Sequence, residues 1–274
     1  MIIDFHTHVF PDKIARKTID LLSKNGGIPP FSDGTLNGLR QKMKEAGTDI
    51  SVTLPVMTSP SQFESITNFT KEINEVFKDE SPRLISFAGI HPDCEDINKK
   101  MAFIRKSGFL GIKIHPDYQG TYIDDEKYVE ILRAAKEYDL IVVTHSGVDG
   151  AYRGTVRCTP ERALRLIRKV PHSKLVLAHM GANEMPREVI DALCGEDVYF
   201  DTAYVLRFIG KDNFEKILKK HGADRILFAS DSPWSDVKND VNIIKSFELD
   251  KRIDLLIFNG RHIRNKGVEP LFFS

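Results

Sequence analysis

The chain has 274 residues, of which 41% are hydrophobic and 28% are charged, the composition of an ordinary globular protein. Lysine plus arginine equals aspartate plus glutamate at 39 residues each, so no net charge favours nucleic acid or an anionic membrane as a partner. No apolar run approaches the ~20 residues that span a bilayer, and the N-terminus shows no secretory signal. The three cysteines lack close CxxC pairing, which argues against disulfides and a thiolate zinc site and favours a reducing, cytoplasmic location.

Short apolar segments recur along the chain and predict eight buried strands. The first of them ends in His6 and His8, and proline or a polar residue ends most of the others. In chain order, the predicted strands are residues 2–8, 49–54, 83–90, 109–115, 140–145, 174–179, 198–201 and 225–231.

Segments with apolar residues at helical spacing alternate with these strands. Gly47 is placed to close the second helix, and Thr159 followed by Pro160 is a good helix start. The predicted helices cover residues 11–23, 35–46, 62–78, 98–107, 125–138, a segment that begins at 159, and residues 186–193, 213–221, 237–247 and 251–258.

Eight strands that alternate with helices over this length predict an α/β fold, a single (β/α)8 TIM barrel formed by residues 1–274. The alternative is a doubly wound open sheet, which usually has fewer strands and often opens with a glycine-rich phosphate loop. No such loop, internal repeat or linker is present in the sequence. One barrel domain is therefore the simplest interpretation.

Histidine, aspartate and lysine gather at the ends of the predicted strands, where the active site of such a barrel lies. Six of the nine histidines end five different strands, a costly set of buried polar groups unless they bind something. A His-x-His pair alone is a weak motif, although His6 and His8 should point to the same side of their strand. Nitrogen and oxygen ligands without cysteine suit zinc, and also manganese, iron, nickel or cobalt. The strand-end residues are His6, His8, His91, Lys113, His115, His145, His179, Asp201 and Asp231.

Five short motifs, taken in order, resemble the metal-dependent amidohydrolase superfamily. They are Asp-Phe-His-Thr-His at 4–8, Gly-Ile-Lys-Ile-His-Pro at 111–116, Thr-His-Ser-Gly at 144–147, Ala-His-Met-Gly at 178–181 and Phe-Ala-Ser-Asp-Ser-Pro-Trp at 228–234. The chain is most similar to the amidohydrolase-related (amidohydrolase 2) TIM-barrel branch, which holds hydrolases and aminocarboxymuconate-semialdehyde-decarboxylase-like enzymes. The resemblance covers residues 2 to about 265 and includes the segment 259–262, which is similar to the family's C-terminal region.

The resemblance implies a role for each matching residue. His6, His8, His145 and Asp231 would bind one divalent ion, with zinc as the first expectation. The ion would lower the pKa of its bound water towards ~7, and Asp231 would move the proton to the leaving group. His179 would orient the water and the substrate, or bind a second ion. Asp231 and His179 are therefore the predicted catalytic residues.

Lys113 stands where binuclear members of the family carry a carbamylated lysine or a glutamate, and His115 shares its face of the strand. Lys113 would either bridge two ions or bind a substrate carboxylate as an ordinary cation. We favour one ion, which leaves Lys113 and His115 for the substrate. Arg153, Tyr204 and Trp234 follow the fifth, seventh and eighth strands and are candidate substrate contacts, with surface ion pairs or simple packing as the alternative.

Two further strand-end residues have a structural explanation as well as a functional one. His91 precedes Pro92 and is expected to be a turn residue or a hydrogen-bond donor to a ligand rather than a ligand itself. Asp201 would either hold the loop after the seventh strand or support a ligand.

The leading functional hypothesis is a metal-dependent hydrolase acting on an amide, ester or lactone-like bond of a small, carboxylated substrate. The alternative is a metal-dependent non-oxidative decarboxylase or hydratase of the same superfamily, which uses the same ligand geometry. A phosphoesterase with a His-x-His strand should end in an Asp-x-His pair, which is absent here, so it ranks low. A non-enzymatic metal-binding barrel would predict a broken ligand set. A homodimer is compatible with the sequence.

Overall fold

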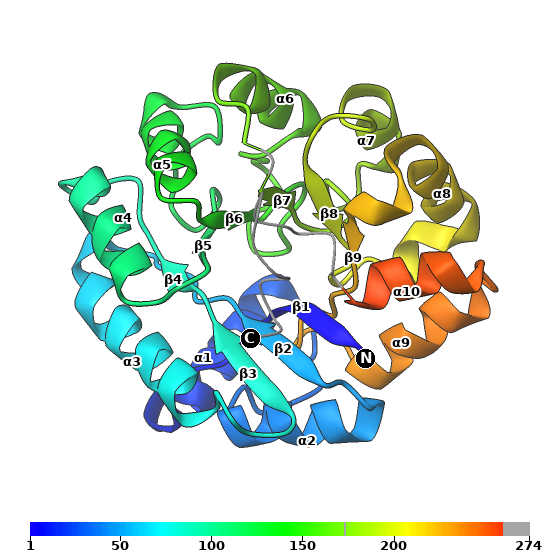
Figure 1. The fold of residues 1–274 in the computed structure, drawn as a ribbon, viewed down its shortest axis with the longest axis horizontal. Helices are drawn as coiled ribbons and strands as arrows, with labels where there is room; N and C mark the ends of the chain where they lie inside the picture. Colours follow the sequence, from blue (N-terminus) through cyan, green and yellow to red (C-terminus); the bar gives the residue numbers. More distant parts are fainter. Residues whose placement is uncertain (173, 260–274) are drawn as a thin grey trace.

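The computed structural model describes residues 1–172 and 174–259, in which a ring of parallel strands is surrounded by helices (Figure 1). This is an α/β barrel of the predicted (β/α)8 type. The strands are β1 (Ile3–Thr7), β2 (Ile50–Thr53), β3 (Arg83–Ser86), β4 (Ala88–Gly89), β5 (Gly111–Ile114), β6 (Ile141–Thr144), β7 (Leu175–Leu177), β8 (Tyr199–Asp201) and β9 (Ile226–Leu227).

Strands β3 and β4 are separated only by Phe87, so they are the two halves of the third barrel strand. The sheets β1-β2-β3 and β4 to β9 meet at this point. On the other side of the ring, Phe5 N–H donates to Phe228 O at 2.9 Å and Asp231 N–H donates to His6 O at 2.8 Å. All pairings between the described strands are parallel, so their C-terminal ends meet at one mouth.

Helices follow the strands and cover the outside of the ring (Figure 1). Thr35 and Thr159 cap their helices through side-chain oxygens that accept from Gly38 and Arg162 N–H, and Gly47 ends its helix at φ 71°. The helices are α1 (Asp12–Gly26), α2 (Leu36–Ala46), α3 (Phe63–Val76), α4 (Ile97–Lys106), α5 (Glu126–Glu137), α6 (Pro160–Lys169), α7 (Pro186–Ala192), α8 (Leu206–His221), α9 (Val237–Ser246) and α10 (Lys251–Asn259), with short 3₁₀ turns η1 (Pro60–Gln62) and η2 (Ala223–Arg225).

Helix α8 begins earlier than the sequence predicted, at Leu206 instead of residue 213. Two helical segments are joined there across Gly210, whose φ of 70° and ψ of 150° are not helical. The first segment was not predicted because a glycine that interrupts apolar spacing reads as a helix boundary.

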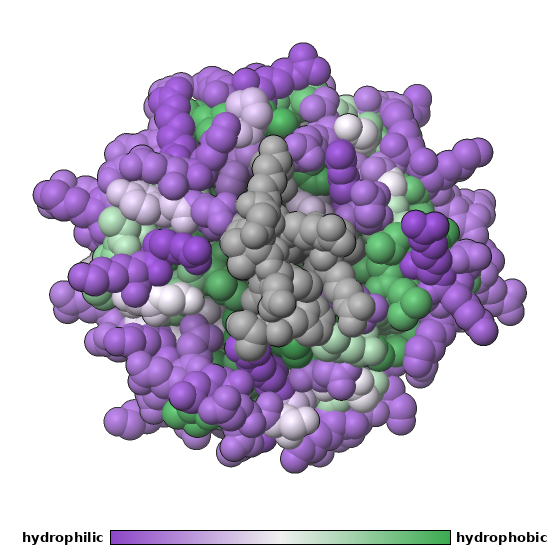
Figure 2. All heavy atoms as spheres, in the orientation of Figure 1, coloured by the Kyte–Doolittle hydropathy of each residue, from purple (hydrophilic) through white to green (hydrophobic). Residues whose placement is uncertain are grey.

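The apolar side chains of the strands form two layers. Phe5, Val143 and Val176 belong to a cluster inside the barrel, whereas Val142 and Leu177 join the larger cluster between the strands and the helices. Side chains that alternate along each strand therefore fill both layers, as expected for strands buried on both faces. On the face shown in Figure 2, the outer rim is mostly hydrophilic, with smaller apolar areas between the polar residues.

Strand β1 departs from strict alternation where the site begins. Phe5 fills the barrel interior, yet the next residue, His6, also faces the mouth. The pairing of β1 with β2 shifts register between Asp4 and Thr7, as in a β-bulge. Such an irregularity re-aims a side chain, and here it turns His6 towards the other strand-end residues.

Candidate active site

A cavity of about 470 Å³ lies at the C-terminal ends of the strands. The structure places every residue that the sequence singled out for catalysis, metal binding or substrate binding on its wall. These residues are His6, His8, Lys113, His115, His145, Arg153, His179, Tyr204, Asp231 and Trp234. The volume is in the range of sites for small organic ligands.

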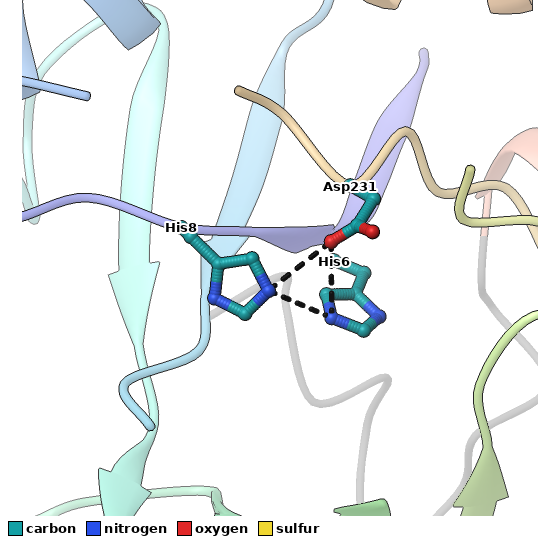
Figure 3. Close-up of side chains that lie close together, drawn as sticks. All are labelled: His6, His8 and Asp231. Carbon is teal, nitrogen blue, oxygen red and sulfur yellow. Dashed lines mark hydrogen bonds and ion pairs between the residues drawn. The ribbon is translucent and has the colours of Figure 1, made fainter. Parts of the chain in front are cut away.

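His6, His8 and Asp231 form the most compact group of potential metal ligands (Figure 3). The His6 and His8 Nε2 atoms are 3.1 Å apart, and Asp231 Oδ1 lies 3.1 Å from His8 Nε2 and 3.6 Å from His6 Nε2. One ligand atom from each residue thus points at a common centre, as Figure 3 shows. Two residues come from β1 and its end and the third from the segment after β9, which are neighbours in the ring.

The far sides of both imidazole rings are held by acceptors. His6 Nδ1 donates to Asp201 Oδ2 at 2.9 Å, and His8 Nδ1 donates to the main-chain oxygen of Leu54 at 2.7 Å. These bonds place the ring protons on Nδ1 and leave Nε2 of each ring with a lone pair. Two lone pairs that face each other at 3.1 Å cannot hydrogen-bond, whereas a shared divalent cation would be bound by both. The donor set therefore fits a metal ion.

His145 and His179 form a second pair across the mouth. His179 Nδ1 donates to Ala203 O at 2.9 Å, and its Nε2 lies 2.9 Å from His145 Nδ1. The rings of His6 and His179 are also close, with centroids 5.6 Å apart. His145 itself groups with His115 and Asp149 rather than with the first three ligands. Its place in a four-ligand site with His6, His8 and Asp231 stays a prediction.

The Asp201 carboxylate aligns residues from two different strands. Its Oδ2 accepts from His6 Nδ1, and its Oδ1 accepts the main-chain N–H groups of His179 (2.9 Å) and Ala203 (3.1 Å). The side chain is fully buried, and burial raises its pKa. The sequence located Asp201 at a strand end but left its role open between loop and ligand support. The contacts join it both to the main chain of residues 179 and 203 and to the ring of His6, whose role as a ligand stays a prediction.

Lys113 is the buried cation of the site. It is 1% exposed, and its Nζ lies 3.0 Å from His6 Nε2, whose single lone pair can either accept from this ammonium group or bind an ion, so an ion at His6 would replace this hydrogen bond. Burial lowers the pKa of Lys113 to about 8, and the charges of Asp201 and Asp231 oppose that shift. The side chain is therefore an ammonium at neutral pH, next to His6, His8 and Asp231, the candidate metal-ligand group.

The imidazoles of His6, His115 and His145 are neutral near pH 7. Burial lowers the pKa of His6, His115 and His145 well below the ordinary value, and the charge of Lys113 adds to the effect. Burial alone would raise the pKa of Asp231, but the neighbouring imidazoles, with His8 the foremost, outweigh it and lower the pKa. Neutral imidazoles beside an ionised carboxylate are the protonation states that metal binding requires.

Two acidic residues near the site were not singled out by the sequence. Asp149 Oδ2 lies 3.6 Å from His115 Nε2, and Asp117 Oδ2 lies 3.8 Å from His145 Nε2. Burial raises the pKa of both carboxyls, to about 6 for Asp117. The only sequence feature that could have indicated Asp117 is its position directly after the fourth-strand motif. No sequence feature indicated Asp149.

The remaining candidates occupy the rim or lie elsewhere. Arg153 pairs with Glu184 at 3.7 Å, and Trp234 O accepts from Arg207. His91 accepts the N–H of Asp93 and is not among the described residues that line the cavity. The C-terminal segment 259–262 lies outside the described residues except for its first position.

The chain belongs to the amidohydrolase family, because the family model described as Amidohydrolase matches residues 3–253. No curated protein matches the sequence. Among the described residues, no helix has the length and apolar character needed to cross a membrane.

Several solved structures share the fold at low sequence identity. The 2,6-dihydroxybenzoate decarboxylase from Rhizobium matches with a TM-score of 0.68 and 15% identity, over 94% of this chain and 95% of its own. The 5-carboxyvanillate decarboxylase from Sphingomonas paucimobilis gives 0.67 and 14%, over 94% and 96%. The dihydroxybenzoic acid decarboxylase from Polaromonas sp. JS666, with bound manganese and the inhibitor 2-nitroresorcinol, gives 0.69 and 15%, over 94% of both chains.

Proposed function

We propose that this protein is a metal-dependent decarboxylase of small aromatic carboxylic acids, and that residues 1–274 act as one catalytic domain. The proposal adopts the decarboxylase alternative in place of the hydrolase that the sequence put first. It is supported by family membership and by the fold shared with three decarboxylases. Decarboxylase and hydrolase use the same ligands, so the choice depends on the rest of the site.

The observation that carries the proposal is the position of Lys113. Its ammonium group is fully buried beside His6 and close to the charge of Asp231, at the inner end of a cavity with many apolar lining residues. A substrate carboxylate bound there would be paired with a cation but separated from water. Loss of CO₂ moves that charge to the ring carbon, and protonation of the ring carbon then neutralises it, so the surroundings favour the overall reaction.

We assign the metal ion to His6, His8 and Asp231, with His145 as the expected fourth ligand. When bound, a divalent ion supplies a Lewis acid that stabilises negative charge on the substrate. Manganese joins zinc as a metal to test first, because a related structure contains it and because nitrogen and oxygen ligands suit both. One ion is the simpler arrangement, since Lys113 already places an ammonium next to His6.

In the proposed reaction, the bond between the ring carbon and the carboxylate carbon breaks, the electron pair stays on the ring carbon, and CO₂ leaves. The ring carbon then takes one proton. We assign its delivery to Asp231, which lines the cavity, and which takes a proton from solvent for each turnover. His179 orients the substrate from the adjoining wall, and His115 and Lys113 bind it.

The test is direct measurement of CO₂. Protein stripped with a chelator and reloaded with one equivalent of Mn²⁺ or Zn²⁺ is incubated with 2,6-dihydroxybenzoate and 5-carboxyvanillate. We expect metal-dependent CO₂ release and, in D₂O, one deuterium in the product for each CO₂ released. Asp93→Asn, at a half-exposed position away from the cavity, serves as the control variant. Hydrolysis of amides or lactones, with no CO₂ from any aromatic acid, would overturn the proposal.

A further inference from the structure

The cavity continues outward from the metal-ligand group, between helix α1 and the first turns of α3. The apolar residues that line it here are Ile14 and Leu22 of α1, Ile28 beyond that helix, and Ile66 and Phe69 of α3. The positions on each helix are three or four residues apart or a multiple of such steps, so each helix presents one face to the cavity. We call this part of the cavity the α1–α3 groove.

The α1–α3 groove has no charged wall. None of the cavity-lining residues in 9–28 and 54–69 is acidic or basic. The charged residues that line the cavity are Lys113, Asp149, Arg153, Glu184 and Asp231, which lie on the ligand group or on the loops across from α1. The side chains there are mostly apolar, with the neutral polar residues Thr18, Thr58, Gln62 and Ser65 between them, so a ligand part that lies in the groove has to be uncharged and largely apolar.

Helix α1 carries more apolar residues than its attachment to the barrel requires. Ala15 and Ile19 are buried against the body of the protein, at 1% and 4% exposure. Leu22 lies three residues after Ile19 and Ile14 is adjacent to Ala15, so the apolar side of α1 extends from the buried pair to the cavity, where Ile14 remains 50% exposed. An apolar stripe that is open to a cavity is unfavourable in water and becomes favourable when a ligand covers it.

The groove and the metal-ligand end belong to one continuous cavity. The loop after β6 crosses the mouth and reaches the end of α1, so that a Cβ on Gly150 would lie 2.9 Å from Gly26 O. Strand β6 is the fifth barrel strand, opposite β1 in a ring of eight, so this contact spans the mouth. A ligand bound at the metal end can therefore extend into the adjoining groove.

We infer that the substrate is an amphiphilic acid, with its carboxylate at Lys113 and the metal ligands and an extended apolar substituent in the α1–α3 groove. The inference rests on the proposed decarboxylase function, because it takes the position of the carboxylate from it. It adds the class of substrate: aromatic acids with an alkyl or similar apolar chain, rather than bare hydroxybenzoates.

Binding of a homologous series tests this substrate class. Mn²⁺-loaded protein is titrated calorimetrically with 2-hydroxybenzoate and with its methyl, propyl and pentyl derivatives, substituted at position 4 and, separately, at position 5. In at least one of the two series, affinity should rise about fourfold for each methylene group that enters the groove.

Variants within the groove distinguish binding of the alkyl substituent from binding of the carboxylate. Leu22→Gln and Ile66→Gln should flatten the dependence on chain length and leave the affinity for 2-hydroxybenzoate itself unchanged. Leu21→Gln is the matched control, because Leu21 is the next residue along α1, is 55% exposed and does not line the cavity. It should keep the wild-type dependence.

The possible failures are distinguishable. If 2-hydroxybenzoate binds but chain length has no effect in either series, the amphiphilic substrate is wrong and the decarboxylase proposal stands. If the chain-length effect is the same in Leu22→Gln, Ile66→Gln and Leu21→Gln, the groove is not where the chain lies, and the inference is overturned. If no acid binds with or without a chain, the proposed function fails together with it.

Discussion

Several residues at the mouth of the barrel have a left-handed, strained backbone. His179, Met180 and Asp231 have φ values of 63°, 54° and 68°, and Tyr204 has 66°. Each such non-glycine residue costs on the order of 1–3 kcal/mol, which persists only where surrounding contacts enforce it. Main-chain bonds provide that enforcement, from Asp231 N–H to His6 O at 2.8 Å and from Met180 N–H to Asp201 O at 2.6 Å. The strained turns direct His179 and Asp231 into the cavity.

Asp201 is the residue whose replacement should reveal how the ligands are oriented. In Asp201→Asn, the side chain has only one oxygen. It can no longer accept from His6 and from the two main-chain N–H groups at the same time. The His6 ring then loses its fixed tautomer, and metal affinity should fall by roughly 10–100-fold. Competition with a chromophoric chelator measures this. Asp79→Asn, at a position 86% exposed, should have no effect, and equal affinities in the two variants would contradict the assignment.

Asp231 and His179 should fail in different ways. Asp231→Asn replaces the charged carboxylate of the group with His6 and His8 by a neutral amide, a far weaker ligand that cannot carry the proton, so metal affinity and turnover should be lost together. His179→Asn leaves that group intact and should keep the ion while turnover falls by roughly 10²–10⁴-fold. Elemental analysis with steady-state rates distinguishes the two. Metal loss in His179→Asn would instead make His179 a ligand and favour two ions.

The loop after β6 should control access to the α1–α3 groove. In Gly150→Ala, the added Cβ would lie 2.9 Å from Gly26 O and 3.3 Å from Gly26 Cα, so the loop has to move away from α1. We expect several-fold weaker binding of alkyl-substituted acids, with a smaller effect on 2-hydroxybenzoate. Gly154→Ala is the control in the same loop, since its Cβ would meet nothing within 4 Å. Unchanged binding of the long-chain acids in Gly150→Ala would show that this contact does not shape the groove.

Helix α8 ends in a histidine that should make the fold sensitive to acid. His221 Nε2–H donates to Val198 O at 3.1 Å, and its Nδ1 accepts from Gly195 N–H at 3.2 Å, so only the neutral ring satisfies both bonds. Burial, helped by the charge of Arg225, lowers the pKa of His221 to about 4. Because the unfolded state binds this proton more readily, the stabilisation is present above about pH 6.5 and is lost as pH falls towards 4.

A variant at this position isolates the effect. His221→Gln keeps a donor and an acceptor but cannot be protonated. Urea unfolding measures the free energy of unfolding of both proteins at pH 7 and at pH 4.5. Between these two pH values, that free energy should fall in the wild type by on the order of 2–3 kcal/mol more than in His221→Gln. Identical pH dependence in both proteins would remove His221 as the cause.

At the scale of the whole molecule, repeated patterns were predictable and local exceptions were not. Eight apolar segments and the helices between them predicted the barrel, because periodicity and the strand-end position of polar residues are properties of sequence. Three local features depend on neighbours that are distant in the chain. They are the register shift that turns His6, the left-handed backbone of His179 and Asp231, and the contact between Gly150 and Gly26. No local sequence pattern encodes these features, and they determine how the side chains of the site are oriented.

The candidate ligands also couple metal binding to the closure of the barrel. His6 and His8 belong to the first strand and its end, and Asp231 follows the last, so an ion would tie together the two strands that complete the ring. An ion that binds only the folded state adds about 2.7 kcal/mol at a free concentration of roughly 100 times its Kd. For a chain of this size, Mn²⁺ or Zn²⁺ should therefore raise Tm by roughly 5–10 °C over the chelated protein. His8→Ala should lose that increase and keep the Tm of the chelated wild type within a few degrees. An equal rise in His8→Ala, measured by calorimetry at the same metal concentration, would place the ion elsewhere in the molecule.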